Sequence, residues 1–296
     1  MKSDVRSILQ NWGICHADIV ENFETHQDKI VCKIKTEIGT IVLKGQPASS
    51  KEDFIIGNIK AHEFLGNLHH MAPKILYKPD GTTFLKNENY YFYLMEFVEG
   101  RKALETLEDE RLLGHASAKL HQLSGYQRKS TYDTKAIIKQ AKDWFSEYTW
   151  KTEFDEILAA LPDFDKYKQC FIHTDIGPHN TIIRGGSIVF IDLDDAGIGS
   201  KHIDIGYPFI AQFVSYNKAT EETHYKFDAA KAFLEGYNSV CKISRLDYDL
   251  IWSGAVLRFI SEMQCYGEEA VEPLWHILKF GLQQKDKLLQ AANFIV

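Results

Sequence analysis

Residues 171–197, FIHTDIGPHNTIIRGGSIVFIDLDDAG, hold the side chains with the clearest chemistry: Asp175, Asn180 and Asp192. Phosphoryl transfer from ATP requires a carboxylate that orients the attacking hydroxyl and oxygen ligands for the magnesium ions that neutralise the phosphates. Asp175 suits the first task, and Asn180 and Asp192 suit the second. The apolar runs around Arg184-Gly185-Gly186-Ser187 predict a β-hairpin between Asn180 and Asp192. Such a hairpin would bring Asn180 and Asp192, the two candidate magnesium ligands, back to the same edge of the strands.

Further elements are expected ahead of this segment, and Lys44 lies among them. Residues 29–44, KIVCKIKTEIGTIVLK, contain two β-rich runs around a turn that ends in Gly39, so they predict a hairpin with Lys44 at the end of a strand. A helix should follow, because Ser50 and Asp53 resemble a capping box. Its inward face recurs at helical spacing through Ile55, Ile59, His62 and Leu65.

The character of the chain changes beyond Gly100. Up to about Met95, the pattern indicates strands that carry a single helix. Thr106 and Asp109 then open a second capping-box pattern, and the remainder is mainly helical except for the strands around residues 168–192. No linker or internal repeat is present. The boundary near residues 95–100 should therefore be a hinge within one compact unit.

The order of these features resembles a known family. The pattern H-x-D-x4-N, followed by a strand ending in Asp, resembles the catalytic and metal loops of the aminoglycoside phosphotransferase and choline kinase superfamily, and protein kinases share this arrangement. MEFVEG at residues 95–100 resembles the family's hinge, LGHASAKLHQL resembles the helix that follows, and HIDIG at residues 202–206 resembles the start of a later helix. The resemblance runs from about residue 20 to residue 210.

This resemblance implies an α+β, protein-kinase-like, two-lobed fold. Residues 1–95 would form a small β-rich lobe with one main helix, and this lobe would bind the nucleotide. Residues 96–296 would form a larger, mainly helical lobe for catalysis and substrate binding.

The resemblance also implies a role for each matching residue of the catalytic lobe. Asp175 would be the catalytic residue that accepts or orients the hydroxyl proton, while Asn180 and Asp192 would bind Mg²⁺. His173 would brace the loop by hydrogen bonding. Asp204 would be the N-cap of the next helix and would also support the catalytic loop.

Nucleotide binding would fall to the β-rich lobe. Lys44 would grip the α- and β-phosphates and would itself be held by an acidic residue of the following helix. Glu63 is the predicted partner, because it lies inside the periodic stretch, and Glu52 is the alternative. The backbone from Glu96 to Val98 would pair with the adenine edge.

Three departures from protein kinases favour a small-molecule acceptor. No GxGxxG precedes the phosphate-binding lysine; ENFETHQDKI occupies residues 21–30, so phosphate contacts there would come from other backbone amides or hydroxyls. Gly177 stands where serine/threonine protein kinases typically carry lysine. The metal loop reads Asp-Leu-Asp-Asp at residues 192–195, and no Ala-Pro-Glu segment follows. The extra carboxylates Asp194 and Asp195 could contact the substrate or a second metal, or could be solvated.

Composition excludes several other classes of protein. A net charge of −7 and a pI near 6.0 argue against a nucleic-acid binder. No apolar run is long enough to cross a bilayer, and the N-terminus lacks the pattern of a secretion signal. Five widely spaced cysteines form no metal-binding pattern, which indicates reduced thiols. We therefore expect a cytoplasmic protein without nucleic-acid or membrane partners; the oligomeric state stays open.

The predicted function is an ATP- and Mg²⁺-dependent phosphotransferase that moves the γ-phosphate to a hydroxyl of a small molecule. The acceptor could be an aminoglycoside or other antibiotic, choline, ethanolamine, homoserine or a sugar, and the acidic surroundings of Asp175 favour a cationic alcohol. The alternatives are a non-catalytic nucleotide-binding regulatory protein of kinase fold and a protein kinase. Aromatic residues after position 140 could either wall the acceptor site or pack in the core: Trp144, Tyr148, Trp150, Tyr207, Phe209, Phe213, Trp252 and Trp275.

Overall fold

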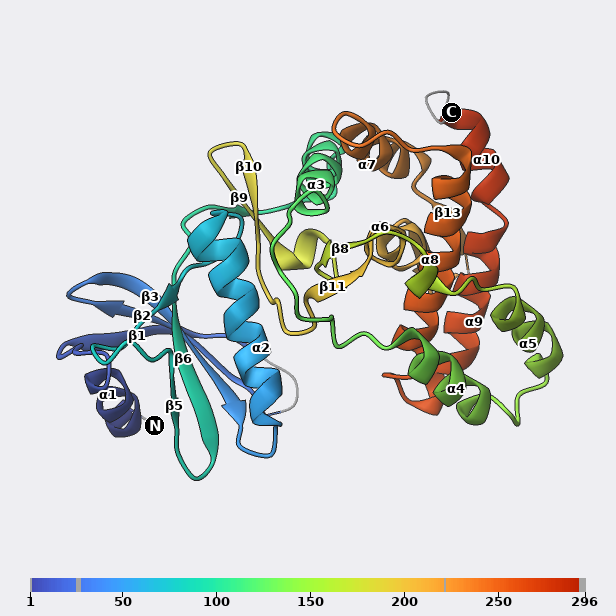
Figure 1. Cartoon of the computed structure of the whole chain (residues 1–296). Helices are drawn as coiled ribbons and strands as arrows, with labels where there is room; N and C mark the ends of the chain where they lie inside the picture. Colours follow the sequence, from blue (N-terminus) through green and yellow to red (C-terminus); the bar gives the residue numbers. More distant parts are fainter. Residues whose placement is uncertain (1, 25–27, 221, 293–296) are drawn as a thin grey trace. The chain divides into compact units, whose positions relative to one another are not determined.

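Two units of different composition make up the computed structural model, which describes residues 2–24, 28–220 and 222–292. The first unit comprises Met1–Arg101, Ile182–Gly185 and Val189–Asp194. The second unit comprises Lys102–Thr181, Gly186–Ile188 and Asp195–Val296. The first unit is built on a β-sheet and the second is mainly helical (Figure 1). This confirms the predicted fold class.

A six-stranded sheet forms the centre of the first unit, in the order β1-β2-β3-β6-β4 with β5 also paired to β6. Its elements are α1 (Lys2–Gln10), β1 (Ala17–Asn22), β2 (Ile30–Thr36), β3 (Gly39–Pro47), α2 (Glu52–His62), the π-helix η1 (Glu63–Leu68), β4 (Ile75–Leu76), β5 (Phe84–Lys86) and β6 (Tyr90–Glu96). The predicted hairpin is present, because β2 pairs with β3 and Thr36 lies opposite Gly39. Lys44 lies inside β3 rather than at its end, since the strand continues to Pro47.

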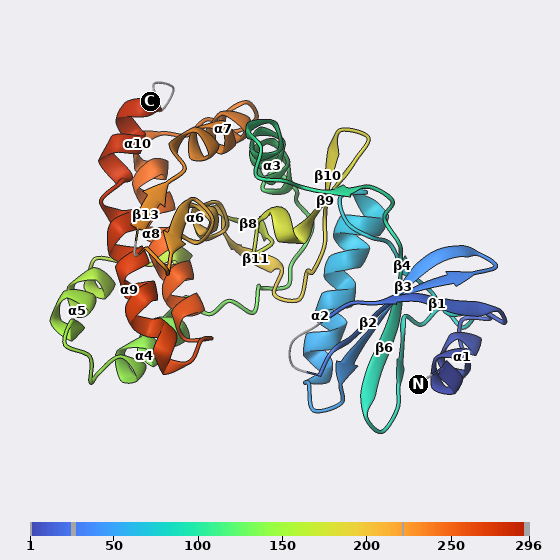
Figure 2. The same ribbon diagram turned by 180° about the vertical axis from the view of Figure 1, so that it is seen from behind.

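Strand β6 is buried on both faces, which explains its apolar and aromatic sequence. Tyr91 and Tyr93 share a cluster with Ile59 of α2. Phe92 and Leu94 share another cluster with residues of α1. Alternate residues of a strand point to opposite faces. The two helices accordingly lie on opposite sides of the sheet, as Figures 1 and 2 show.

Two local predictions for the first unit are wrong. Helix α1 is a second helix of this unit, and it forms because Val5, Ile8 and Leu9 recur at helical spacing and are buried. The capping box at Ser50 is also absent, because α2 begins after Lys51, and Lys51 offers no side-chain acceptor to the free backbone N–H groups.

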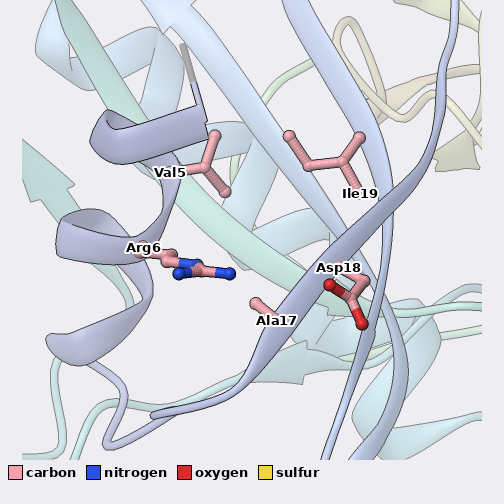
Figure 3. Close-up of a pocket in the computed structure, with 5 residues that line it drawn as sticks. All are labelled: Val5, Arg6, Ala17, Asp18 and Ile19. Carbon is pink, nitrogen blue, oxygen red and sulfur yellow. The ribbon is translucent and has the colours of Figure 1, made fainter.

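A small pocket lies between α1 and β1, as the close-up in Figure 3 shows. Val5 and Arg6 of α1 line it together with Ala17, Asp18 and Ile19 of β1. Its volume is about 100 Å³, whereas pockets for small-molecule ligands typically have about 300–1,000 Å³. None of the predicted site residues lines it, so we do not assign the active site to this pocket.

The second unit contains most of the helices. Its helices are α3 (Leu107–Leu120), α4 (Thr134–Trp144), α5 (Lys151–Ala159), α6 (Lys201–Ala211), α7 (Phe227–Asn238), α8 (Arg245–Met263), α9 (Glu268–Leu282) and α10 (Lys285–Ala291), with 3₁₀ turns η2 (Phe164–Lys166) and η3 (Pro178–Asn180). Strands β8 (Gln169–Ile172) and β11 (Gly197–Ser200) pair, as do β12 (Val214–Asn217) and β13 (Glu222–Tyr225). Thr106 caps α3 as predicted, because its side chain accepts a hydrogen bond from the Asp109 N–H.

A further sheet joins β7 (Arg101–Lys102), β9 (Thr181–Arg184) and β10 (Ser187–Phe190) in the order β10-β9-β7. Gly185 and Gly186 connect β9 to β10 with φ values of 56° and 77°. Positive φ at both central residues is the requirement of a tight hairpin turn that glycine meets without strain. The predicted hairpin is confirmed.

Helices α6 and α8 pack with their backbones in contact. A Cβ atom added at Gly206 of α6 would lie 2.4 Å from the Ala255 nitrogen, and one added at Gly254 of α8 would lie 2.1 Å from the His202 oxygen. Both distances are far below van der Waals contact, so glycine is required on both sides. This close approach fixes the two helices that carry Asp204 and Arg258.

Most of the aromatic residues singled out above belong to the core of the second unit. Trp150 stacks on Trp275 at 4.5 Å between ring centroids, and Phe209 packs edge-on against Trp252. Tyr207 differs from them, because its ring faces the guanidinium of Arg258 near the catalytic loop. Helices that could span a membrane are absent from the described residues.

Glu110 of α3 is a carboxyl group that is almost completely buried. Its Oε1 atom accepts a hydrogen bond from Gln212, while its Oε2 atom and the Gln212 Oε1 atom have no hydrogen-bond partner among the described residues. Burial, with Glu105 nearby, raises the pKa of Glu110 to about 8. A protonated carboxyl group would supply the donor that the Gln212 oxygen lacks.

The buried Glu110 predicts a loss of stability on the alkaline side. Because its folded pKa lies above its unfolded value, its contribution is most favourable at low pH, declines between about pH 4.5 and pH 8, and is constant above. Between pH 6 and pH 9 the decline is about 2–3 kcal/mol. Glu110→Gln should remove this part of the pH dependence, and thermal unfolding at several pH values measures it. Glu108→Gln, at an exposed position of the same helix, should leave the pH dependence unchanged; equal slopes for wild type and Glu110→Gln would contradict the assignment.

Candidate active site

The segment after β8 brings Asp175 and Asn180 together. The Asn180 side-chain amide donates to Asp175 Oδ2 at 2.8 Å and to the Asp175 backbone oxygen at 3.1 Å. The turn η3 places Asn180 there, since its N–H bonds back to the Gly177 oxygen. Two of the three side chains predicted for phosphoryl transfer are thus neighbours within the second unit.

The backbone of residues 173–180, the predicted catalytic loop, is anchored by Asp204. The Asp204 carboxylate accepts hydrogen bonds from the N–H of His173 at 2.8 Å and of Thr174 at 2.6 Å. It also contacts His121 Nε2 at 2.9 Å. Asp204 lies inside α6, whose N-cap is Ser200, so the predicted N-cap role is wrong. Its carboxylate instead serves amides that are distant in sequence.

His173 and His179 contact the catalytic loop from within. His173 Nδ1 lies 3.3 Å from the Asp175 N–H, the bracing position expected for this residue. His179 Nε2 lies 3.4 Å from Asp175 Oδ2. A Cβ atom added at Gly177 would lie 2.5 Å from the His179 ring, so glycine lets this ring approach the loop.

Asp175 is held in its charged form. Burial alone would raise the pKa of Asp175, but the hydrogen bond from His179 and the charge of Arg258 outweigh it and hold the pKa below its usual range. The same contact raises the pKa of His179. A charged carboxylate that is about one-third exposed can accept a hydrogen bond from an incoming hydroxyl.

The first unit contains a separate charged cluster around Lys44 of β3. Lys44 Nζ lies 2.8 Å from Asp192 Oδ1 and 2.5 Å from Asp194 Oδ1. Burial alone would lower the pKa of Lys44, but the charge of Asp194 outweighs it and keeps the pKa well above its usual value. Asp192, the predicted metal ligand, thus shares a lysine with Asp194, the predicted substrate ligand.

Asp194 is saturated by donors. Besides Lys44, Asn58 donates to its Oδ1 atom at 3.1 Å, and Lys29 and Gln46 donate to its Oδ2 atom at 2.9 and 3.1 Å. Burial opposes ionisation, yet Lys44 and Lys29 outweigh it and hold the pKa of Asp194 below its usual range. A carboxylate has about four acceptor positions, and all are occupied. Asp194 therefore acts as an internal anchor for Lys44.

The acidic partners predicted for Lys44 bind elsewhere in the described part of the chain. Glu63 Oε1 accepts a hydrogen bond from the Tyr77 hydroxyl at 2.6 Å, and Glu52 Oε2 accepts one from the Tyr91 hydroxyl at 3.3 Å. Neither glutamate contacts Lys44. The structure does not bring Glu63 to Lys44 because α2 ends at His62 and Glu63 begins a π-helix.

The inner face of α2 presents Asn58 and His62 in place of a glutamate. Both side chains are buried, and they lie four residues apart, on one face of the helix. His62 Nδ1 donates to the Pro73 carbonyl at 3.2 Å, and burial with the charge of Lys44 lowers the pKa of His62 to about 4. His62 was predicted to lie on the inward face of this helix, whereas Asn58, a polar residue on the same face, was not.

At the predicted hinge, the described hydrogen bonds narrow the choice of adenine donor. The Glu96 N–H donates to the Lys74 oxygen and the Phe97 N–H donates to the Thr40 oxygen, each within the first unit. Among the three amides from Glu96 to Val98, these bonds leave the Val98 N–H available. Residues 21–30 were expected to supply further phosphate contacts. Residues 25–27 of this segment lie outside the described residues.

The donor set suits magnesium. Asn180 uses its amide nitrogen for both hydrogen bonds to Asp175, so its side-chain oxygen remains available. Asp192 uses Oδ1 for Lys44, and its side chain is half-exposed. Mg²⁺ prefers oxygen ligands, keeps several waters and needs one or two carboxylates alongside the substrate phosphates. Asp195, the remaining predicted residue, accepts a hydrogen bond from Thr131 within the second unit.

Comparison with known proteins finds a matching family and several similar folds. The sequence model described as "Phosphotransferase enzyme family" matches residues 32–230. Choline kinase from Cryptosporidium parvum has a similar fold, with a TM-score of 0.67, 13% identity and coverage of 99% of this chain and 98% of that chain. Amicoumacin kinase, solved with AMP-PNP, Ca²⁺ and Ami, gives a TM-score of 0.64 and 15% identity over 97% and 93% of the chains. A microcompartment-associated aminopropanol kinase has a TM-score of 0.61 and 15% sequence identity, with 99% of this chain and 99% of that chain covered.

Proposed function

The chain belongs to the phosphotransferase enzyme family, and from this premise we propose that it transfers the γ-phosphate of ATP to a hydroxyl of a small molecule. The observation that carries the proposal is the contact of Asp175 with Asn180 on a loop anchored by Asp204. A charged carboxylate beside an amide oxygen donor fits the positioning chemistry of phosphoryl transfer.

In this proposal Asp175 accepts a hydrogen bond from the acceptor hydroxyl and directs its oxygen at the γ-phosphate. Lys44 binds the nucleotide phosphates, Val98 donates its N–H to the adenine, and Asn180 and Asp192 would hold Mg²⁺. The metal would neutralise negative charge on the phosphates when bound.

The acceptor we favour is a cationic alcohol, such as an amino alcohol or an aminoglycoside. Asp175 and Glu262 both lie beside Arg258, Asp175 also contacts His179, and Asp195 is a further carboxylate of the same unit. This surplus of carboxylates attracts a positive group. The net charge of −7 and the free thiols also support a cytoplasmic enzyme without nucleic-acid partners.

The test is ADP release measured with ATP and Mg²⁺ across amino alcohols, aminoglycosides and neutral sugars. We expect turnover with a cationic alcohol that disappears when EDTA removes the metal. Nucleotide binding without turnover on any acceptor would favour the non-catalytic regulatory alternative. Transfer to a protein but to none of these small molecules would favour a protein kinase.

Asp192→Asn should raise the Mg²⁺ concentration needed for half-maximal turnover by about tenfold or more, because one charged ligand is lost. Asp18→Asn is the matched control, since it removes an exposed carboxylate of β1 in the same unit. An unchanged Mg²⁺ requirement in Asp192→Asn would remove Asp192 from the metal site.

A further inference from the structure

Arg258 of α8 contacts the catalytic loop at two points. Its Nε atom donates to the Thr174 carbonyl oxygen at 2.7 Å, and its Nη2 atom lies 3.4 Å from Asp175 Oδ1. A planar guanidinium presents its donors in a fixed fork. The guanidinium of Arg258 therefore fixes two adjacent loop residues, Thr174 and Asp175, although Arg258 follows Thr174 by 84 positions in sequence.

The loop needs such support, because Thr174 has a φ of 77°. A β-branched residue in the left-handed region is an uncommon and strained conformation, of about 1–3 kcal/mol, that persists only where its surroundings hold it. Asp204 binds the Thr174 N–H from α6, and Arg258 binds the Thr174 oxygen from α8. The strained residue is therefore held on both sides by helices that pack backbone to backbone.

Arg258 is itself fixed in place. Its guanidinium carbon lies 4.5 Å from the centre of the Tyr207 ring and 5.6 Å from that of Tyr132. Glu262, one turn further along α8, lies 3.9 Å away and accepts a hydrogen bond from the Tyr207 hydroxyl. The Arg258 side chain is only 12% exposed. An arginine packed between aromatic faces has little freedom to reach for a ligand.

We propose that Arg258 is a positioning residue, which holds the strained Thr174 peptide so that the Asp175 carboxylate is aimed at the acceptor hydroxyl. This inference rests on the proposed function and assigns no direct contact between Arg258 and the substrate. Asn180, His179 and the Arg258 Nη2 atom contact the carboxylate, and the Arg258 Nε atom also ties the backbone that carries it to α8.

The first experiment measures kcat and both KM values for Arg258→Gln and Arg258→Lys. We expect kcat to fall by about 10–100-fold, because small displacements of a catalytic group cost about this much. The KM for ATP should stay within about twofold. Arg258→Lys keeps the charge but not the fork, so it should recover only part of kcat. Arg245→Gln is the matched control, since Arg245 lies on the same helix in an exposed pair with Asp249.

A double-mutant cycle then asks whether Arg258 acts through Asp175. In an Asp175→Asn background, Arg258→Gln should lower kcat by less than twofold, since the group it positions is already disabled. Guanidinium added to Arg258→Ala should restore part of kcat, and this variant separates the lost group from a general defect in folding. A full additional loss in the double mutant, or a raised acceptor KM with unchanged kcat, would overturn the proposal.

Hydrogen exchange provides a readout that does not depend on turnover. Peptides covering residues 171–177 should exchange faster in Arg258→Gln than in wild type, and Arg245→Gln should match wild type. Unchanged exchange in that segment would overturn the holding role whether or not the chain is a kinase. Absence of turnover in the wild-type chain would instead overturn the proposed function.

Discussion

Asp175→Asn is expected to lower kcat by about 10²–10⁴-fold, the range attributed to a positioned acid–base group. The substituted amide keeps the size of the side chain and can still accept from Asn180. It loses the negative charge that His179 of the loop and Arg258 of α8 stabilise. ATP affinity should change little, because the Lys44 cluster lies in the other unit and does not involve Asp175.

Steady-state kinetics with an active acceptor, together with calorimetric titration of ATP, measure both quantities. Asp228→Asn is the matched control in the same unit, because Asp228 is an exposed carboxylate of α7 that has no part in the proposed site. Turnover of Asp175→Asn close to that of wild type would show that another group orients the hydroxyl.

Asp194→Asn should destabilise the protein and weaken ATP binding. The substitution replaces one carboxylate oxygen of residue 194 with an NH₂ group, which donates hydrogen bonds. In one orientation this NH₂ group would face the donors Lys44 and Asn58, and in the other it would face Lys29 and Gln46. Removing one partner of a buried charge pair costs about 3–5 kcal/mol. A lysine without its anchor should also bind phosphates less well, and we expect about a tenfold weaker Kd for ATP.

Glu63→Gln is the decisive comparison for Asp194→Asn, because Glu63 is the residue that helical periodicity favours as the partner of Lys44. Its contact with the Tyr77 hydroxyl is at the surface, so thermal unfolding and the Kd for ATP should both stay close to those of wild type. A larger effect for Glu63→Gln than for Asp194→Asn would return the anchoring role to α2.

Local patterns predicted what depends on local geometry. The Gly185-Gly186 turn was predictable because two consecutive positive φ angles are nearly reserved for glycine. The contact of Asp175 with Asn180 was predictable because five positions separate them on one loop. Thr106 was recognisable as an N-cap, since its hydroxyl satisfies a backbone donor three residues later.

Contacts between distant segments were not predictable in the same way. Asp194 and Lys44 are 150 positions apart, and no periodicity relates them. Glu63 was favoured because it lies in the helical stretch, but it is one position beyond His62, about 100° around the helix from the buried face. Arg258 had one signal that went unused: it is the only charged residue in the run GAVLRFIS, residues 254–261, and a charge amid apolar residues of a helix needs a buried partner.

The ion pair between Lys44 and Asp192 gives the resting protein a built-in counter-ion. In the proposed kinase Lys44 would turn toward the phosphates of an arriving nucleotide, and Asp192 would then lose its positive neighbour. A nucleotide that arrives as a magnesium chelate delivers the replacement charge in the same event, whereas free ATP would bring four negative charges toward an uncovered carboxylate. In the proposed kinase, therefore, uptake of nucleotide and uptake of metal should be one coupled exchange of cations.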